Sequence, residues 1–165
     1  MYDRLEKRNL IKNYKMDEEL LNRNKNINRG FRKLEVWKEA VELYVFVTKK
    51  IRSLDAVPYK VKAQIEDSIF SVHSNIAEGY SRRSLKENIQ FINVSLSSLA
   101  ENYSQIIALH SAGDIEKEWF DAYDKKHYSL ENKLIQFNKT MIEKLDKNNW
   151  KNDYIIRELI EKYES

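Results

Sequence analysis

Apolar residues recur at intervals of four and three along three successive segments of this chain, and the two intervals alternate strictly in the second and third segments. The spacing averages close to one helical turn, so it places these residues on one face of an α-helix. The repeats run through Val61, Ile65, Ile69, Val72 and Ile76, then Leu85, Ile89, Ile92, Leu96, Leu99, Tyr103 and Ile106, and then Phe120, Tyr123, His127, Leu130, Leu134, Phe137 and Met141. With three Gly and one Pro in 165 residues, the composition argues against an all-β fold. The segments predict three long helices.

A further helix is predicted upstream, from near Phe31 to the break at Pro58, which cannot continue a helical hydrogen-bond ladder. Apolar residues occupy more of its circumference than one core face needs. They form a first stripe of Leu34, Trp37, Val41, Tyr44 and Ile51, and a second stripe of Val36, Ala40, Leu43, Phe46 and Val47. The excess implies a second buried contact. We therefore expect an oligomer interface that contains Val36, Leu43, Phe46 and Val47.

Four helices with short connections predict an all-α fold, an up-and-down antiparallel four-helix bundle with neighbours that cross at roughly 20°. We expect the bundle to occupy residues 31–146. Residues 1–30 are predicted to be a basic N-terminal extension that ends in an Asn-rich linker, and residues 147–165 to hold a short accessory helix. Ser84 and Glu87 have the spacing of a capping box at the start of the third bundle helix.

Polar residues lie beside the apolar stripes of the second and third helices. Those predicted to specify helix packing are Gln64, Asn75, Glu78, Ser98 and Glu101. In an antiparallel hairpin that turns near residues 82 and 83, Asn75 is expected near Gln90 or Phe91, and Gln64 or Ser68 near Glu101. Buried polar groups of this kind must be hydrogen-bonded, and they fix which faces pair and in what register. The functional alternative, a carboxylate pair of Glu78 and Glu101, is disfavoured because the two residues lie at different levels of the bundle.

Positive charge is concentrated toward the N-terminus, where residues 1–33 hold ten Lys or Arg against five acidic residues. Such an arm can lie along phosphates, although a solvated tail is the alternative interpretation. A second basic group is predicted at the exposed hairpin turn. The candidate nucleic-acid contacts are Arg23, Lys25 and Arg29 in the arm and Arg82, Arg83 and Lys86 at the turn.

The sequence offers no pattern for catalysis, a cofactor or a metal. It has no Cys, no Gly-rich phosphate loop, and no His three residues after a Glu, the spacing of metal sites in helical bundles. His127 lies on an apolar stripe and is expected to be an interior residue. We therefore predict a protein that is not an enzyme and binds no small-molecule substrate. No export signal or membrane span is evident, which favours a cytoplasmic protein that does not associate with membranes.

Two segments carry a family resemblance, residues 74–80 (SNIAEGY) and residues 98–101 (SLAE). Residues 34–40 (LEVWKEA) and 84–88 (SLKEN), with Phe91, add to it. Over about residues 31 to 145 the chain resembles the four-helix bundle proteins encoded in intervening sequences of bacterial large-subunit ribosomal RNA genes. That family is similar to the accessory bundle proteins of diversity-generating retroelements. The chain departs from it at Glu66 and Asp67, where many members have two Arg, and at His73, where Pro is common.

The resemblance implies a bacterial homo-oligomer, with a pentamer favoured, and RNA, DNA or a reverse transcriptase as partner. The acidic pair at residues 66 and 67 makes nucleic-acid binding through that surface doubtful. We therefore expect a non-enzymatic accessory protein that associates with nucleic acid. The alternative is a protein-binding scaffold or regulatory module without nucleic-acid contact.

Overall fold

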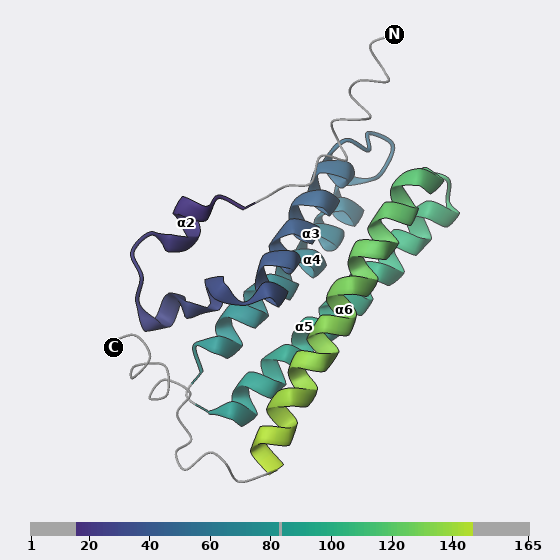
Figure 1. Cartoon of the computed structure of the whole chain (residues 1–165). Helices are drawn as coiled ribbons and strands as arrows, with labels where there is room; N and C mark the ends of the chain where they lie inside the picture. The colour runs from purple at the N-terminus through teal and green to yellow at the C-terminus, as the bar shows by residue number, and fades with distance from the viewer. Residues whose placement is uncertain (1–15, 83, 147–165) are drawn as a thin grey trace.

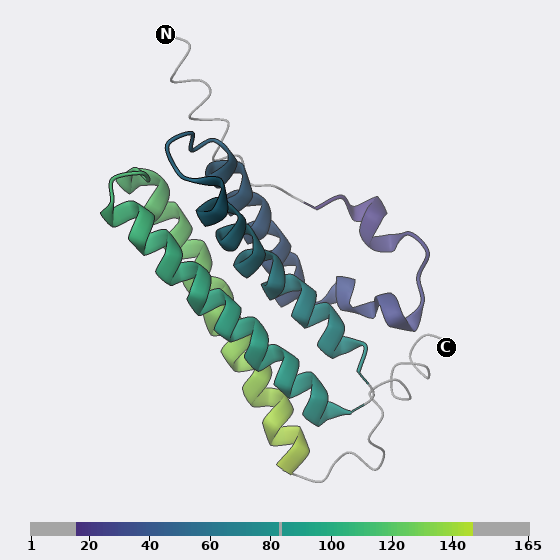
Figure 2. The same cartoon turned by 180° about the vertical axis from the view of Figure 1, so that it is seen from behind.

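Four long helices form an antiparallel bundle in the computed structural model, which describes residues 16–82 and 84–146 (Figures 1 and 2). They are α3 (Glu35–Arg52), α4 (Tyr59–Tyr80), α5 (Leu85–Ser111) and α6 (Lys117–Asp146). Each helix packs on the next, and α3 also packs on α6, which closes the bundle. The described residues contain no strand, and the prediction of an all-α antiparallel bundle is confirmed. The predicted accessory helix, like residues 1–15 of the extension, lies outside the described residues.

The two ends of α5 are set by residues that favour the start and the end of a helix. The Ser84 hydroxyl accepts a hydrogen bond from the Glu87 backbone N–H at 3.2 Å and donates one to the Glu87 carboxylate at 2.9 Å. This is one half of the predicted capping box, since Glu87 contacts the hydroxyl of Ser84 and not its backbone N–H. After α5 the backbone turns at Gly113, whose φ of 86° suits a residue without a side chain.

The core of the bundle is built from the predicted stripes of α4, α5 and α6. On α3 it is built from the second stripe, together with Ile51 from the end of the first stripe. Val36, Leu43 and Val47 are buried within the subunit, so the prediction that they form an oligomer interface is wrong. Phe46 is partly buried and stacks on Trp119 of α6 at 4.9 Å between ring centroids. The second stripe is the core stripe because α3 packs against both α4 and α6.

Residues 16–33 fold back onto the bundle through two short helices, α2 (Glu18–Asn22) and the 3-10 helix η1 (Ile27–Lys33). Asp17 caps α2 by accepting a hydrogen bond from the backbone N–H of Glu19, and Asn26 caps η1 in the same way through Arg29. The prediction of an Asn-rich linker up to Gly30 is therefore wrong for η1, which packs on α3 and α4. Among the described residues, no helix is long and apolar enough to cross a membrane.

Candidate nucleic-acid interface

Gly30 anchors η1 to the bundle end at which α4 turns into α5. The glycine is buried, and a Cβ at this position would overlap the ring of Tyr80, the last residue of α4. Next to it, the ring of Phe31 lies edge-on against Trp37 at 5.0 Å and against Tyr80 at 6.5 Å. The arm and the α4–α5 turn, which are about 50 residues apart in the sequence, therefore meet at one end of the bundle, called the basic end below (Figure 1).

Arg32 holds the arm in its folded shape. Its guanidinium group donates to the backbone carbonyls of Leu20 at 3.0 Å and Arg23 at 2.8 Å, and more weakly to those of Asn24 and Arg29. Carbonyls at the end of a helix lack intrahelical donors, so a guanidinium with several N–H groups can satisfy a group of them. Arg32 is thus an internal brace, although it lies in the most basic part of the chain.

The predicted cations of the arm lie on its surface. Arg23, Lys25 and Arg29 are all exposed. Arg23 has a long ion pair of 3.8 Å with Glu19, and Arg29 donates to the Asn24 carbonyl at 3.4 Å. These contacts are weak, so the three side chains keep their charge available to a partner.

At the α4–α5 turn the predicted residues differ from one another. Arg82 forms an ion pair with Glu78, and its guanidinium lies over the Phe91 ring at 4.6 Å from the centroid. Arg82 therefore joins α4 to α5 and is a poor candidate for a phosphate contact. Lys86 is exposed on the first turn of α5. Arg83 lies outside the described residues.

Two of the predicted packing residues meet at the α4–α5 interface. The Ser98 hydroxyl donates to the Ser71 hydroxyl at 3.0 Å, and the Asn75 amide donates to the same hydroxyl at 2.8 Å and to the Ser71 carbonyl at 2.7 Å. Asn75 therefore hydrogen-bonds within its own helix, and its hydrogen bonds lead to α5 through Ser71. The predicted contact of Asn75 with Gln90 or Phe91 does not appear among its hydrogen bonds.

The other three predicted packing residues face solvent, so their assignment is wrong. Gln64, Glu78 and Glu101 are exposed. Glu101 accepts a hydrogen bond from Gln105 of its own helix at 3.2 Å, while Glu78 is bound to Arg82. The prediction fails for these residues because each of them lies outside the contact area between α4 and α5.

A polar cluster that the sequence did not predict lies in the interior and is centred on Asn102. The Asn102 amide donates to the Ser68 hydroxyl at 3.0 Å and to the Ile65 carbonyl at 3.2 Å, and its oxygen accepts from the Tyr123 hydroxyl at 2.9 Å. Burial raises the pKa of Tyr123, so its hydroxyl stays protonated and remains a donor. Asn102 thus ties α4, α5 and α6 together. The position of Asn102 between Leu99 and Ile106, on the buried side of α5, is the sequence feature that could have predicted its burial.

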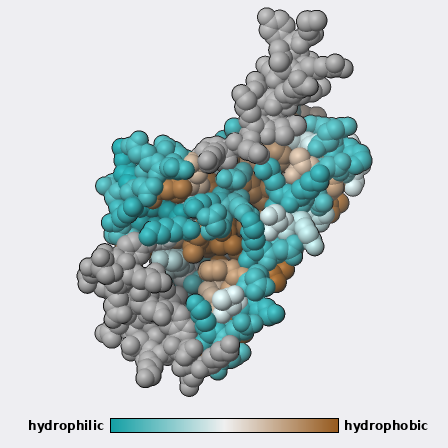
Figure 3. All heavy atoms as spheres, viewed as in Figure 1, coloured by the Kyte–Doolittle hydropathy of each residue, from teal (hydrophilic) through white to brown (hydrophobic). Residues whose placement is uncertain are grey.

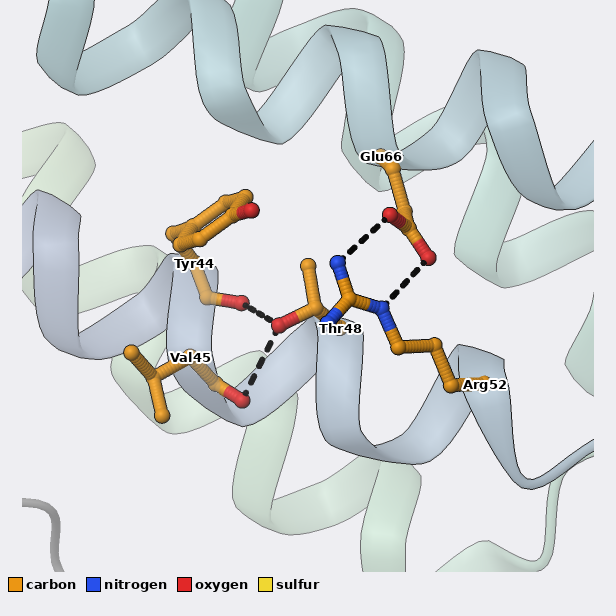
Figure 4. Close-up of polar contacts among 5 residues, drawn as sticks. All are labelled: Tyr44, Val45, Thr48, Arg52 and Glu66. Carbon is orange, nitrogen blue, oxygen red and sulfur yellow. Dashed lines mark hydrogen bonds and ion pairs between the residues drawn. The ribbon is translucent and has the colours of Figure 1, made fainter.

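The acidic residue at position 66 has a basic partner. Arg52 of α3 donates two hydrogen bonds to the carboxylate of Glu66, from Nε to Oε1 at 3.1 Å and from Nη2 to Oε2 at 2.9 Å (Figure 4). A bidentate ion pair of this kind fixes the relative position of the two helices. Asp67 is exposed. The α3–α4 surface therefore carries a neutralised pair and an acid, which makes it a poor surface for phosphate.

Nothing among the described residues forms a metal-binding group of three or more His, Asp or Glu. His127 is buried, with Nε2 at 3.0 Å from the Leu99 carbonyl and its ring stacked on Tyr103 at 4.5 Å, so the prediction of an interior residue is confirmed. A hollow of about 490 Å³ lies between α2 and α3, where hydrophobic atoms are visible beside the arm (Figure 3). Its lining mixes acidic and basic residues such as Glu35 and Lys38, which already pair with each other.

Comparison with known proteins identifies a family for most of the bundle. The model of one protein family, described as 23S rRNA-intervening sequence protein, matches residues 32–136, which is more than half of the chain. The match begins inside η1 and ends inside α6, so it includes α3, α4 and α5 completely. No curated protein matches the sequence. The chain belongs to the 23S rRNA-intervening sequence protein family.

Proposed function

We propose that this protein is a non-enzymatic, oligomeric accessory protein that binds structured RNA through its basic end. The observation that carries the proposal is the close packing of Gly30 on Tyr80, which joins the basic arm to the α4–α5 turn. A reverse transcriptase that acts on the same RNA is the kind of enzyme it would accompany. The family description, which refers to intervening sequences of 23S rRNA, motivates RNA as the nucleic acid.

The electrostatics of the basic end support this choice. Lys25, Arg29 and Lys86 are exposed cations on two separate segments, so together they can span more than one phosphate. Each phosphate that a protein neutralises releases bound counterions, and this makes affinity fall steeply as salt rises. The proposed contacts are to phosphates and not to base edges, so we expect binding that is weak and largely insensitive to the RNA sequence.

Assembly into a homo-oligomer, with five copies as the expected number, belongs to the same proposal. Several basic ends on one particle would bind one RNA with an effective concentration that a single copy lacks. Weak contacts of one subunit would then add up to useful affinity.

The alternative function, a protein-binding scaffold without nucleic-acid contact, is favoured by a different observation. Several cations of the bundle are already paired within the subunit, as in Arg52 with Glu66, Lys133 with Glu39 and Arg82 with Glu78. A surface whose charges pair internally attracts phosphate weakly.

A titration of structured RNA at low and physiological salt separates the two functions. The variant Lys25→Glu, Arg29→Glu, Lys86→Glu is expected to bind about tenfold or more weakly, with a smaller slope of log affinity against log salt, by about one for each lost phosphate contact. The matched control is Lys49→Glu, Lys125→Glu, Lys139→Glu, which makes the same charge change at exposed residues of α3 and α6. Equal losses in both variants, or no binding by the natural chain at low salt, would favour the scaffold.

A further inference from the structure

Three aromatic side chains meet at the basic end. The ring plane of Phe31 in η1 makes an angle of 67° with that of Trp37 in α3 and of 74° with that of Tyr80 at the end of α4. We call these three residues the aromatic corner. All of them are partly exposed, whereas Tyr123 in the interior is fully buried. The aromatic corner therefore keeps apolar ring area in contact with water, and covering that area with a ligand is favourable.

Phe31 is the ring of the aromatic corner on which a flat ligand can stack. Tyr80 lies against the backbone of Gly30, since a Cβ added to this glycine would overlap its ring, and Trp37 packs against the core. Both neighbours meet Phe31 edge-on. Among the described residues, no aromatic ring is stacked in parallel on Phe31. The position of a parallel partner is therefore not taken by a ring of the protein.

Exposed cations accompany the aromatic corner on two elements. Arg29 precedes Phe31 by two residues in η1, and Lys86 lies just after the α4–α5 turn. Proteins that bind single-stranded nucleic acid combine cations for the phosphates with aromatic rings for the bases. Phe70 of α4, an aromatic residue exposed to 52%, lacks this setting, because the exposed Asp67 precedes it by one helical turn and repels phosphate. The basic end therefore has the combination that Phe70 lacks.

We propose that the aromatic corner is a binding site for an unpaired nucleobase of RNA, which stacks on Phe31 while the adjoining phosphates contact the exposed cations. Bases inside a duplex are already stacked on both faces, whereas bases in loops and bulges are free to stack on an aromatic side chain. Every base has a π-face, so such a site accepts any base and agrees with binding that is insensitive to sequence. The inference rests on the proposed RNA contact. It adds that the RNA must carry unpaired nucleotides.

Two RNA hairpins that differ only in the bases of their loops test the site with the full chain. One hairpin has a natural loop, and the other has abasic loop nucleotides, so both carry the same number of phosphates. We expect the abasic hairpin to bind about tenfold more weakly, the size expected for the loss of one base stacked on an aromatic side chain. Equal affinities would overturn the inference and leave the phosphate contacts in place. Binding of neither hairpin at low salt would refute the RNA contact, and this site with it.

Variants of Phe31 separate base stacking from a structural role of the ring. Phe31→Leu should bind both hairpins as weakly as the natural chain binds the abasic one, with an unchanged slope of log affinity against log salt because the cations remain. Phe31→Tyr should keep the preference for the natural loop. Phe70→Leu, the matched change at an exposed aromatic residue of α4, should leave both affinities unchanged. If Phe31→Leu weakens both hairpins equally and the preference persists, the ring only holds the arm in place and the assignment is wrong.

Discussion

Replacing Asn102 with alanine is expected to lower the free energy of unfolding by about 3 kcal/mol. The substitution removes the partner of the buried Tyr123 hydroxyl and two hydrogen bonds to α4, and it leaves a small cavity. An unsatisfied buried polar group costs about 1–3 kcal/mol, and lost packing adds to that cost. Chemical denaturation of the natural and variant chains, compared at equal protein concentration, measures the difference.

Tyr123→Phe provides the control for this prediction. It removes one hydroxyl and leaves the ring stacked near Trp119 at 5.4 Å, so we expect a smaller loss, of about 1 kcal/mol. The double variant should lose less than the sum of the two single variants, because both substitutions break the same hydrogen bond. Additive losses, or a cost below about 1 kcal/mol for Asn102→Ala, would mean that the cluster does not hold the three helices together.

The second large effect is expected at Gly79, where α4 and α5 approach closely. The glycine is buried, and a Cβ there would lie 2.8 Å from Cβ of Phe91 and 2.9 Å from Oδ1 of Asn88. Gly79→Val should therefore cost about 3 kcal/mol, since overpacking a tight contact forces the helices apart.

A less bulky change at the same residue, and a matched one elsewhere, sharpen this prediction. Gly79→Ala should cost less than Gly79→Val, because alanine regains about 1 kcal/mol through its higher helix propensity. Ala63→Val, on a partly exposed part of α4, should change stability by no more than about 0.5 kcal/mol. Similar losses for Gly79→Val and Ala63→Val in thermal unfolding would show that the close approach of the helices at Gly79 is unimportant.

The bundle could be predicted from the sequence because burial and helical period coincide along α4, α5 and α6. Ile65, Ile69, Val72 and Ile76 are all fully buried, as their spacing predicts. The period fails on α3, where two adjacent stripes are both apolar. The pattern alone does not say which stripe faces the bundle axis, and that depends on α3 lying between α4 and α6.

The pairing of α4 with α5 could be predicted only to within about one turn. The expected contacts assume that residues equally distant from the turn are neighbours. Side chains lean toward the N-terminus of their helix, so a residue covers a spot about one position before its own Cα. On α4 this lean points away from the turn, and on α5 it points toward the turn. The α5 residue that meets a given α4 residue therefore lies farther from the turn than that α4 residue does. Ser98 therefore meets Ser71, and the residue of α5 that bonds to Ser68 is Asn102 and not Glu101.

The contact between the arm and the bundle could not be predicted, because it depends on two residues far apart in sequence. The close approach of Gly30 to Tyr80 has no periodic signal, and an Asn-rich segment is typical of linkers. The roles of the individual cations could not be predicted either. The sequence gives the number of Arg and Lys residues. Only the structure separates Arg32 and Arg82, which brace the fold, from the exposed Lys25, Arg29 and Lys86.

Hydrogen exchange of the full chain, with and without structured RNA, tests whether the arm and the α4–α5 turn form one RNA-binding surface. RNA is expected to slow amide exchange in two separate segments, residues 27–33 and residues 80–88, while the opposite bundle end at residues 52–60 exchanges as before. The loss of protection in both segments should occur together in Lys25→Glu, Arg29→Glu, Lys86→Glu. Protection of one segment alone, or slower exchange at residues 52–60 instead, would contradict the account.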